Sequence, residues 1–410
     1  MKCEWESSKI GDLGKIITGK TPPTKNQDLW DGNIPFITPR DLQNGKTVLC
    51  TERTITSNGI KVMQSVKLPP KSVCVSCIGN IGYVAMTCSE CISNQQINSI
   101  IVNSNNDADF VYYLMKSLHS TFKNYEGQST TLSILNKKHF SDIDICIPPL
   151  DIQKQIAAIL SALDEKIAIN RAINDNLLEQ IKTICTAWLS DYKPFDGVMP
   201  SDWVETPLSD IAEFISGYSY KGTELTNSTI AMATIKNFDR KGGFKLDGYK
   251  EIIPSSKLKE SQHAELFDTL VAHTDLTQNA EVIGNAEPVM SKSEYDDIVF
   301  SMDLVKVLPK KDGVSKFLIA AILQDKKFKA HCLGYVNGTT VLHLSKKALP
   351  EYKLFLPSDF STLKPLDEVV TALYKQVSSN ISENTYLEEL REALLPKLMS
   401  GEIDVSTVQF

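Results

Sequence analysis

One segment near the N-terminus has the spacing of a nucleotide phosphate-binding loop. Residues 14–21, GKIITGKT, match the pattern GxxxxGK[ST], in which backbone N–H groups and a lysine hold phosphate. That chemistry needs a helix to open at the Lys-Thr pair, but Pro22 and Pro23 follow at once and disfavour a helical first turn. The apolar residues of Ile10–Ile17 instead predict a short amphipathic helix that ends at Gly19. We therefore exclude nucleotide binding by this segment.

A second group of residues has the spacing of a zinc site. Cys74 with Cys77 and Cys88 with Cys91 form two Cys-x2-Cys pairs, which are the ligands of a four-thiolate zinc centre. The run Val73–Ile78 around the first pair predicts a β-strand, on which residues three apart point to opposite faces. We therefore predict no metal site and interpret these cysteines as structural thiols.

Motifs of nucleophilic or acid–base catalysis are absent from the sequence. The six histidines form no HExxH pair, and there is no GxSxG, GxGxxG or Asn-Pro-Pro-aromatic motif. The sequence therefore offers no positive sign of an enzyme, although catalytic groups dispersed along the chain would leave no such motif.

The remaining candidates are polar loops suited to nucleic-acid recognition. Asn and Gln pair with adenine, Arg and Lys with guanine, and Thr and Ser contact phosphates or base edges. The first half of the chain offers Thr21, Lys25, Arg40, Lys46, Asn80, Asn94, Gln95, Gln96, Thr130 and Thr131. The second half offers Tyr220, Lys221, Lys236, Asn237, Arg240, Lys241, Thr277, Gln278, Asn279, Thr339 and Thr340. The same residue types also form ordinary solvated turns, so the pattern alone leaves both interpretations open.

The elements that must position these loops occur twice in the chain. Trp5, Asp12, Ile17 and Gly19 recur 198 residues later as Trp203, Asp210, Ile215 and Gly217. Thr130, Thr131, Leu135, Lys137 and Lys138 recur 209 residues later as Thr339, Thr340, Leu344, Lys346 and Lys347. The matches keep their order with small drifts in spacing, which indicates one duplicated unit of about 200 residues.

Each unit combines a mixed globular part with a long helix. Short β-branched runs at 72–78, 97–102 and 143–147 predict strands, and 109–117 predicts a helix. A long helical pattern follows Pro148-Pro149 in the first unit and Pro357 in the second.

The two long helices carry a coiled-coil seam. Apolar residues alternate in steps of four and three over 156–188 and again over 366–398, spans of about 32 residues or roughly 48 Å. Both seams are interrupted at matching layers, by Asn170 and Asn174 in one helix and by Asn380 and Asn384 in the other. A buried Asn fixes register because slippage leaves its amide unpaired, although the same residues also suit the solvated edge of a seam. We predict that the two helices pair antiparallel.

These patterns predict a mixed α/β (α+β) fold with two pseudo-repeated globular domains separated by two long antiparallel coiled-coil helices. The predicted segments are a domain at 1–150, a helix at 151–192, a domain at 193–358, a helix at 359–400 and a tail at 401–410.

The charge of the chain is distributed unevenly. The formal net charge is −7, and residues 151–190 and 358–410 together carry −6 of it. The globular parts are close to neutral and contain basic pairs such as Lys137-Lys138 and Lys346-Lys347. The acidic total therefore does not exclude nucleic acid, but it indicates that the helices are not the surface that binds it.

The order of these motifs resembles the specificity (S) subunit of type I restriction–modification systems. The resembling segments of the first copy are Leu13–Pro22, Ile34–Leu42, Val75–Ala85, Asn94–Asn98, Leu135–Pro149 and Gln153–Asp164. Those of the second copy are Phe214–Gly222, Leu270–Ala286, Gly338–Leu349 and Leu394–Val405. The resemblance covers essentially the whole chain, but the second copy lacks the forms IPFITPRDL and SCIGNIG of the first. We interpret this departure as a difference in the sequences that the two copies recognise.

The resemblance implies that each globular part is a target recognition domain that reads one half of a split site in double-stranded DNA. It also implies that the helices act as a spacer and dock two modification (methyltransferase) subunits, which restriction subunits join. S-adenosylmethionine, ATP and Mg²⁺ would be bound by those partners, and this chain would bind no cofactor and hold no catalytic residue.

A different class of function is a two-module adaptor that binds protein or glycan on a coiled-coil hinge and has no role with DNA. Either protein is expected in the cytoplasm, away from membranes. The N-terminus MKCEWESSKI is too polar for a signal peptide, and the nine cysteines are scattered.

Overall fold

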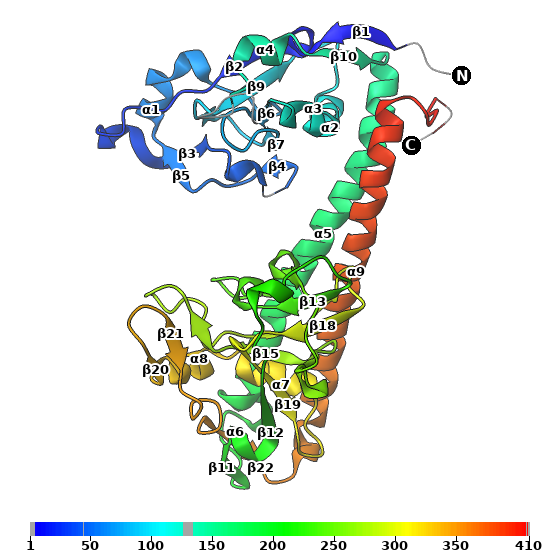
Figure 1. Ribbon diagram of the computed structural model, residues 1–410. Coiled ribbons are helices and arrows are strands. Elements are labelled where there is room, and N and C mark those ends of the chain that lie inside the picture. The colour runs from blue at the N-terminus through cyan, green and yellow to red at the C-terminus, as the bar shows by residue number, and fades with distance from the viewer. Residues whose placement is uncertain (1–4, 44, 126–133, 407, 409–410) are drawn as a thin grey trace. The chain divides into compact units, whose positions relative to one another are not determined.

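The chain divides into two units that share one arrangement of strands. The computed structural model describes residues 5–43, 45–125, 134–406 and 408. The units are Met1–Ile167 with Leu387–Phe410, and Ala168–Tyr386 (Figure 1).

The first unit contains a five-stranded main sheet. Its strands lie in the order β2 (Gly14–Thr18), β9 (Ile97–Val102), β6 (Val73–Ser76), β7 (Val84–Thr87) and β4 (Thr47–Val48). Neighbours are antiparallel except β4 and β7, which are parallel. A second sheet has the order β5 (Arg53–Ile55), β3 (Trp30–Ile37) and β8 (Ile92–Ser93). The entry strand β1 (Glu6–Lys9) pairs antiparallel with the exit strand β10 (Asp144–Ile147).

Both faces of this main sheet are buried, because alternate side chains of a strand point to opposite sides. Val73 and Val75 pack in one core with helix α2 (Ala108–Ser117), whereas Cys74 packs in another with α1 (Ser57–Val62) and the second sheet. The carboxylate of Asp107 caps the start of α2 by accepting the N–H of Phe110. The unit also contains α3 (His119–Lys123) and α4 (Lys137–Ser141).

The second unit repeats this plan. Its main sheet has the order β12 (Ala212–Ser216), β19 (Leu304–Pro309), β15 (Thr269–Ala272) and β17 (Ala286–Pro288), and all neighbours in it are antiparallel. Its second sheet has the order β14 (Lys250–Glu251), β13 (Ile230–Ala233) and β18 (Asp297–Phe300), and β13 runs parallel to β18 as β3 does to β8. A small third sheet has the order β16 (Thr274–Asp275), β21 (Leu342–Leu344) and β20 (Val336–Asn337). The entry strand β11 (Trp203–Pro207) pairs with the exit strand β22 (Lys353–Pro357).

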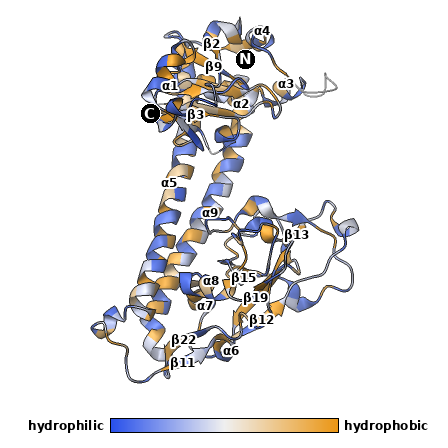
Figure 2. Cartoon of the chain, turned by 90° about the vertical axis from the view of Figure 1, so that its left-hand side faces the viewer, coloured by the Kyte–Doolittle hydropathy of each residue, from blue (hydrophilic) through white to orange (hydrophobic). Residues whose placement is uncertain are grey.

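The helices of the second unit cover the same sheet face as α2 does in the first. Leu318 and Ile322 of α7 (Lys316–Leu323) pack against Val271 and Val305 of the sheet. Figure 2 shows hydrophobic residues along β12, β15 and β19, as expected for strands that contribute to a core on each face of the sheet. The remaining short helices are α6 (Leu208–Ile211) and α8 (Lys326–Leu333). The predicted mixed α/β fold and the duplication are thus both confirmed.

Two long helices complete the chain, α5 (Leu150–Leu189) and α9 (Lys364–Met399). Helix α5 begins directly after Pro148-Pro149, and α9 carries Pro365 in its first turn, where proline is tolerated because its missing N–H has no partner in the helix. Within each unit the helices lie antiparallel. Asn170 bonds Asn384 in the second unit, and Asp164 bonds Arg391 in the first. Among the described residues, no helix combines the length and apolar character that a lipid bilayer requires.

One predicted helix is wrong. Ile10–Ile17 forms a 3-10 turn (Ile10–Leu13) followed by strand β2, so Gly19 follows a strand and caps no helix. Ile16 and Ile17 pack into different cores, which requires an extended backbone. Pairing with β9 over five residues thus prevails over the helical spacing of the apolar residues.

Candidate nucleic-acid interface

The candidate loops of the first unit leave one edge of its main sheet. The register pairs Thr18 at the end of β2 with Asn98, and Ser76 at the end of β6 with Ile97 at the start of β9. The segments after β2, after β6 and before β9 therefore emerge together. We call this the reading edge of the first unit: residues 19–25, 79–82 and 93–96.

Direct contacts join these segments. The Thr21 hydroxyl donates to Gln95 Oε1 at 2.6 Å, and Asn94 Nδ2 donates to Gln96 Oε1 at 2.9 Å. Asn80 is exposed in a tight turn, which the Ser76 hydroxyl holds by donating to the Asn80 carbonyl at 2.7 Å. The structure thus brings Thr21, Asn94, Gln95 and Gln96 together and presents Asn80 at the same edge. Asn94 is buried and both ends of its amide bond Gln96, which contradicts the prediction that it contacts DNA.

Gly19 makes the close approach of β2 to this edge possible. A Cβ atom at Gly19 would lie 2.2 Å from the carbonyl oxygens of Ser93 and Asn94. Gly217 occupies the matching place in the second unit, where a Cβ would lie 2.0 Å from the Ser301 carbonyl oxygen. Both glycines therefore serve backbone contact at the sheet edge.

The basic candidates of the first unit lie in different environments. Lys46 is turned inward, because its ammonium contacts Asp109 at 2.6 Å and the Ser161 hydroxyl at 2.7 Å. This arrangement fits an anchor between the domain and α5 better than a DNA contact. Arg40 is exposed and lies 3.4 Å from Glu52, and Lys25 is exposed. Thr130 and Thr131 lie outside the described residues.

The second unit presents its candidates at the corresponding edge. Ser216 at the end of β12 pairs with Val305, and Ala272 at the end of β15 pairs with Leu304 at the start of β19. Tyr220 and Lys221 follow β12, and Thr277, Gln278 and Asn279 follow β15. We call residues 217–221, 273–284 and 301–303 the reading edge of the second unit.

Two further loops meet this edge. Gln278 Nε2 donates to the backbone carbonyls of Thr339 and Thr340. The guanidinium of Arg240 lies 3.2 Å from Glu281, which also belongs to the edge. The structure therefore gathers Arg240, Gln278, Thr339 and Thr340, which are far apart in the sequence.

Asp275 organises the central loop of this edge. Its side chain is buried and accepts the N–H groups of Thr277 at 2.8 Å and of Val282 at 2.7 Å, as well as the Thr277 hydroxyl. Burial alone would raise the pKa of this carboxyl, but the donors together lower it below its usual value. An ionised Asp275 thus holds the loop from 276 to 283 in one conformation.

The remaining candidates of the second unit divide into buried and exposed side chains. Asn237 is fully buried, accepts the N–H of Thr234 and donates to the Lys245 carbonyl. Its burial contradicts the prediction that it contacts DNA, because both ends of its amide are used within the loop. Lys236, Lys241 and Asn279 are exposed.

The cysteines do not gather as a zinc site would require. Cys74 and Cys77 pack into different cores on opposite sides of the sheet, and Cys88 is exposed. Burial raises the pKa of Cys77 to about 12 and that of Cys74 to about 11, which keeps both thiols protonated. Within the described ranges, no group of three metal-ligating side chains is close enough to hold an ion.

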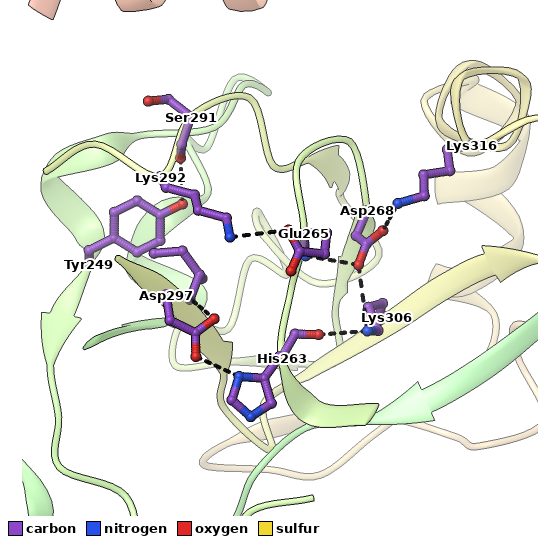
Figure 3. Close-up of polar contacts among 10 residues, drawn as sticks. Tyr249, His263, Glu265, Asp268, Ser291, Lys292, Asp297, Lys306 and Lys316 are labelled. Atoms are coloured by element: carbon purple, nitrogen blue, oxygen red, sulfur yellow. Dashed lines mark hydrogen bonds and ion pairs between the residues drawn. The ribbon is translucent and has the colours of Figure 1, made fainter. Parts of the chain in front are cut away.

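A buried ionic cluster fixes the far end of β15 in the second unit (Figure 3). The carboxylate of Asp268, next to the start of this strand, contacts the ammonium groups of Lys316 at 2.6 Å and Lys306 at 3.5 Å. Lys306 also donates to the carbonyl of His263, whose ring lies 2.5 Å from Asp297. Because these contacts tie β15 to β19 and α7, they anchor the strand that leads to the reading edge.

Sequence reasoning missed the segment at 301–303, although a signal for it existed. Asn94, Gln95 and Gln96 precede β9, and Ser301, Met302 and Asp303 precede the equivalent strand β19. The duplication therefore pointed to this segment. Its place at the edge is fixed by the Thr274 hydroxyl, which donates to Asp303 Oδ1 at 3.0 Å.

The four asparagines of the helical seam lie buried against one another in the second unit. Asn170 Nδ2 donates to Asn384 Oδ1 at 2.9 Å, and Asn380 Nδ2 donates to Asn174 Oδ1 at 2.8 Å. Their amides are thus paired across the two helices, as a role in register requires. That role itself stays a prediction.

Comparisons with known proteins identify a matching family model and several relatives of this chain. Residues 2–179 match a model described as the type I restriction modification DNA specificity domain. The chain is 25% identical to the MjaIX specificity subunit of Methanocaldococcus jannaschii, over 98% of this chain and 94% of that one. Over nearly its full length, the chain is thus similar to the specificity subunits of type I restriction–modification systems.

Further relatives extend the match. The HindI specificity subunit of Haemophilus influenzae is 34% identical over 43% of this chain and 39% of its own length. The crystal structure of the S subunit from M. genitalium covers 96% of both chains with a TM-score of 0.52 and 16% identity, which shows a shared fold. A type I specificity subunit confers DNA sequence specificity and is not catalytic, so the adaptor interpretation is not favoured.

Proposed function

We propose that each globular domain of this specificity subunit, at 1–150 and 193–358, reads one half of a bipartite site in double-stranded DNA through its reading edge. The observation that carries this proposal is the equivalence of the two edges. In both units, polar loops leave the ends of equivalent strands, and hydrogen bonds hold them together. Asn, Gln, Thr and Arg at such an edge offer the donors and acceptors that distinguish base pairs in the major groove.

The helices at 151–192 and 359–400 set the spacing between the half-sites and dock two modification subunits. Their acidic surface supports this division, because a negative surface repels DNA phosphates and suits a protein partner. S-adenosylmethionine is bound by the modification subunits, and ATP and Mg²⁺ by the restriction subunits. The complex works in the cytoplasm, where its DNA substrate lies.

Methylation-aware sequencing of a host that carries the chain with its modification subunit tests the proposal. We expect adenine methylation at one bipartite motif, which disappears when the gene for this chain is removed. Thr21→Ala with Gln95→Ala is expected to alter one half of the motif, and Gln278→Ala with Asn279→Ala the other half.

Asn105 provides a matched control for these substitutions. It is exposed and lies beyond the end of β9, on the opposite edge of the same sheet. Asn105→Ala should leave both halves unchanged. A motif that is not bipartite, or one whose two halves respond to the same pair of substitutions, would refute the assignment of one half-site to each domain.

A further inference from the structure

Two large apolar side chains are exposed at the reading edge of the second unit. Leu276 has an exposed fraction of 68%, and Met302 of 56%. Both lie among hydrogen-bonding residues of the edge, since Leu276 precedes Thr277 and Met302 precedes Asp303. On a surface that reads base edges, an exposed apolar side chain is available for contact with an apolar group of the DNA.

The first unit has amides at the equivalent positions. Leu276 lies four residues after the end of β15 at Ala272, and Asn80 lies four residues after the end of β6 at Ser76. Met302 lies two residues before the start of β19 at Leu304, and Gln95 two residues before the start of β9. The strand registers are equivalent, because Ala272 pairs with Leu304 as Ser76 pairs with Ile97.

The segments that carry Leu276 and Met302 are bonded to each other and held firmly. The His273 N–H donates to the Asp303 carbonyl at 2.8 Å, and the Thr274 hydroxyl donates to the Asp303 side chain. The buried carboxylate of Asp275 fixes the backbone on the other side of Leu276, and the Asp268 cluster anchors the strand that precedes it. Leu276 is therefore exposed on a rigid support.

The apolar group that DNA offers at its base edges is the thymine methyl. In the major groove thymine presents its C5-methyl group beside the O4 acceptor, whereas the other bases present donors and acceptors alone. We infer that Leu276 and Met302 contact thymine methyl groups, so that the second domain reads thymine where the first domain reads bases through amides. Asp275 acts as the positioning residue for this contact. The inference rests on the proposed function.

Replacement of thymine by uracil tests the inference, because uracil lacks only the methyl group. The assay uses the full chain in complex with its modification subunits and duplexes that carry the methylated motif, with each thymine replaced in turn. We expect one or more replacements in a single half-site to weaken binding by about three- to tenfold. Leu276→Ala or Met302→Ala should abolish that preference while the other half-site stays unaffected.

Val204→Ala is the matched control. Val204 is exposed to 50% in the same unit but lies on β11, outside the reading edge, so its loss should leave the preference for thymine intact. Asp275→Asn should weaken the preference while melting of the complex stays cooperative, which separates positioning from a loss of folding.

Three results would overturn the inference: a motif without thymine in the half-site of the second domain, equal affinity for every uracil duplex, or an undiminished preference in both alanine variants. A complex that binds no bipartite duplex at all would instead overturn the proposed function. Specific binding without any effect of uracil leaves the proposed function standing and rejects only the methyl contact.

Discussion

Single glycines set the backbone geometry of both reading edges. Gly19 and Gly217 match in the duplicated sequence, and each lies where a strand end passes over the carbonyl of a neighbouring segment. Neither position needs the left-handed backbone that commonly explains a glycine. The absence of a Cβ atom is what allows the contact.

Gly217→Ala is therefore expected to destabilise the second unit. A methyl group 2.0 Å from the Ser301 carbonyl forces the edge apart, which should lower the free energy of unfolding by roughly 1–3 kcal/mol. The melting temperature of the variant complex measures this loss, and methylation should fail at one half-site first. Gly222→Ala is the control, because nothing lies within 4 Å of its added Cβ. Equal melting temperatures for the two variants would contradict the explanation.

The pairing of α5 with α9 depends on more than its asparagines. Both helices carry Asn at matching layers, so those layers would also be satisfied if two copies of α5 paired with each other. The ion pair of Asp164 with Arg391 is not repeated in this way. The equivalent residues on the opposite helix are Tyr374 for Asp164 and Ile181 for Arg391, and both are buried in the apolar core of the second unit. In the first unit the hydroxyl of Tyr113 donates to Asp164 at 2.6 Å, and Arg391 forms an ion pair with the same carboxylate. Homotypic pairing would separate Arg391 from Asp164 and place each charge opposite an apolar or aromatic side chain, so this pair favours α5 with α9.

Exchange of the two charges tests this explanation. Asp164→Arg alone or Arg391→Asp alone places like charges in contact and should cost about 2 kcal/mol or more, because both side chains are largely buried. The double variant restores an ion pair and should recover most of the loss. Melting temperatures of the three variants measure the coupling between the sites. A double variant no more stable than the single ones would show that the two positions act independently.

Local patterns in the sequence predicted most helices and strands, but they did not predict contacts between distant segments or which loop residues are buried. The run at 97–102 is the strand as found, and the helix at 109–117 begins one residue earlier, because apolar spacing and capping are local signals. Ile10–Ile17 was wrongly predicted as a helix, because its secondary structure depends on pairing with β9, which lies far along the chain. The sequence also could not show that the Lys46 side chain points into the protein, because its partners Asp109 and Ser161 lie in distant segments. Asn237 was misassigned because a buried loop residue and an exposed one have the same local sequence pattern.

For the molecule as a whole, the proposed function makes the helix pair a ruler between two half-sites. Residues 161–176 of α5 and 382–393 of α9 belong to neither of the hydrophobic cores that include parts of these helices. Polar contacts such as Lys46 with Ser161 and Tyr113 with Asp164 join the first domain to one end of this stretch, but apolar packing does not fix its length. The number of base pairs between the two half-sites then depends on the number of residues in this stretch of the helices.

Insertion of seven residues into each helix should lengthen the spacer. Placed between 172 and 173 and between 382 and 383, the insertions keep the heptad phase and leave both asparagine layers paired. They add about 10 Å of helix, or roughly three base pairs. Methylation-aware sequencing should find the same two half-sites farther apart. An unchanged spacer would rule out the ruler, and an insertion in one helix alone, which breaks the pairing, should abolish methylation.

The pairing of entry and exit strands makes each globular domain exchangeable as a unit during evolution. In each unit the first strand of the globular domain lies beside its last, β1 with β10 and β11 with β22, and a long helix begins within seven residues of the exit strand. Each globular domain is thus connected to the rest of the chain through two ends that lie side by side. Genetic recombination that replaces everything between those ends would deliver a new target sequence in one event, while the helices and their protein partners stay as they were. Under the proposed function, a cell would in this way change which DNA sites are methylated without any change in the modification subunits.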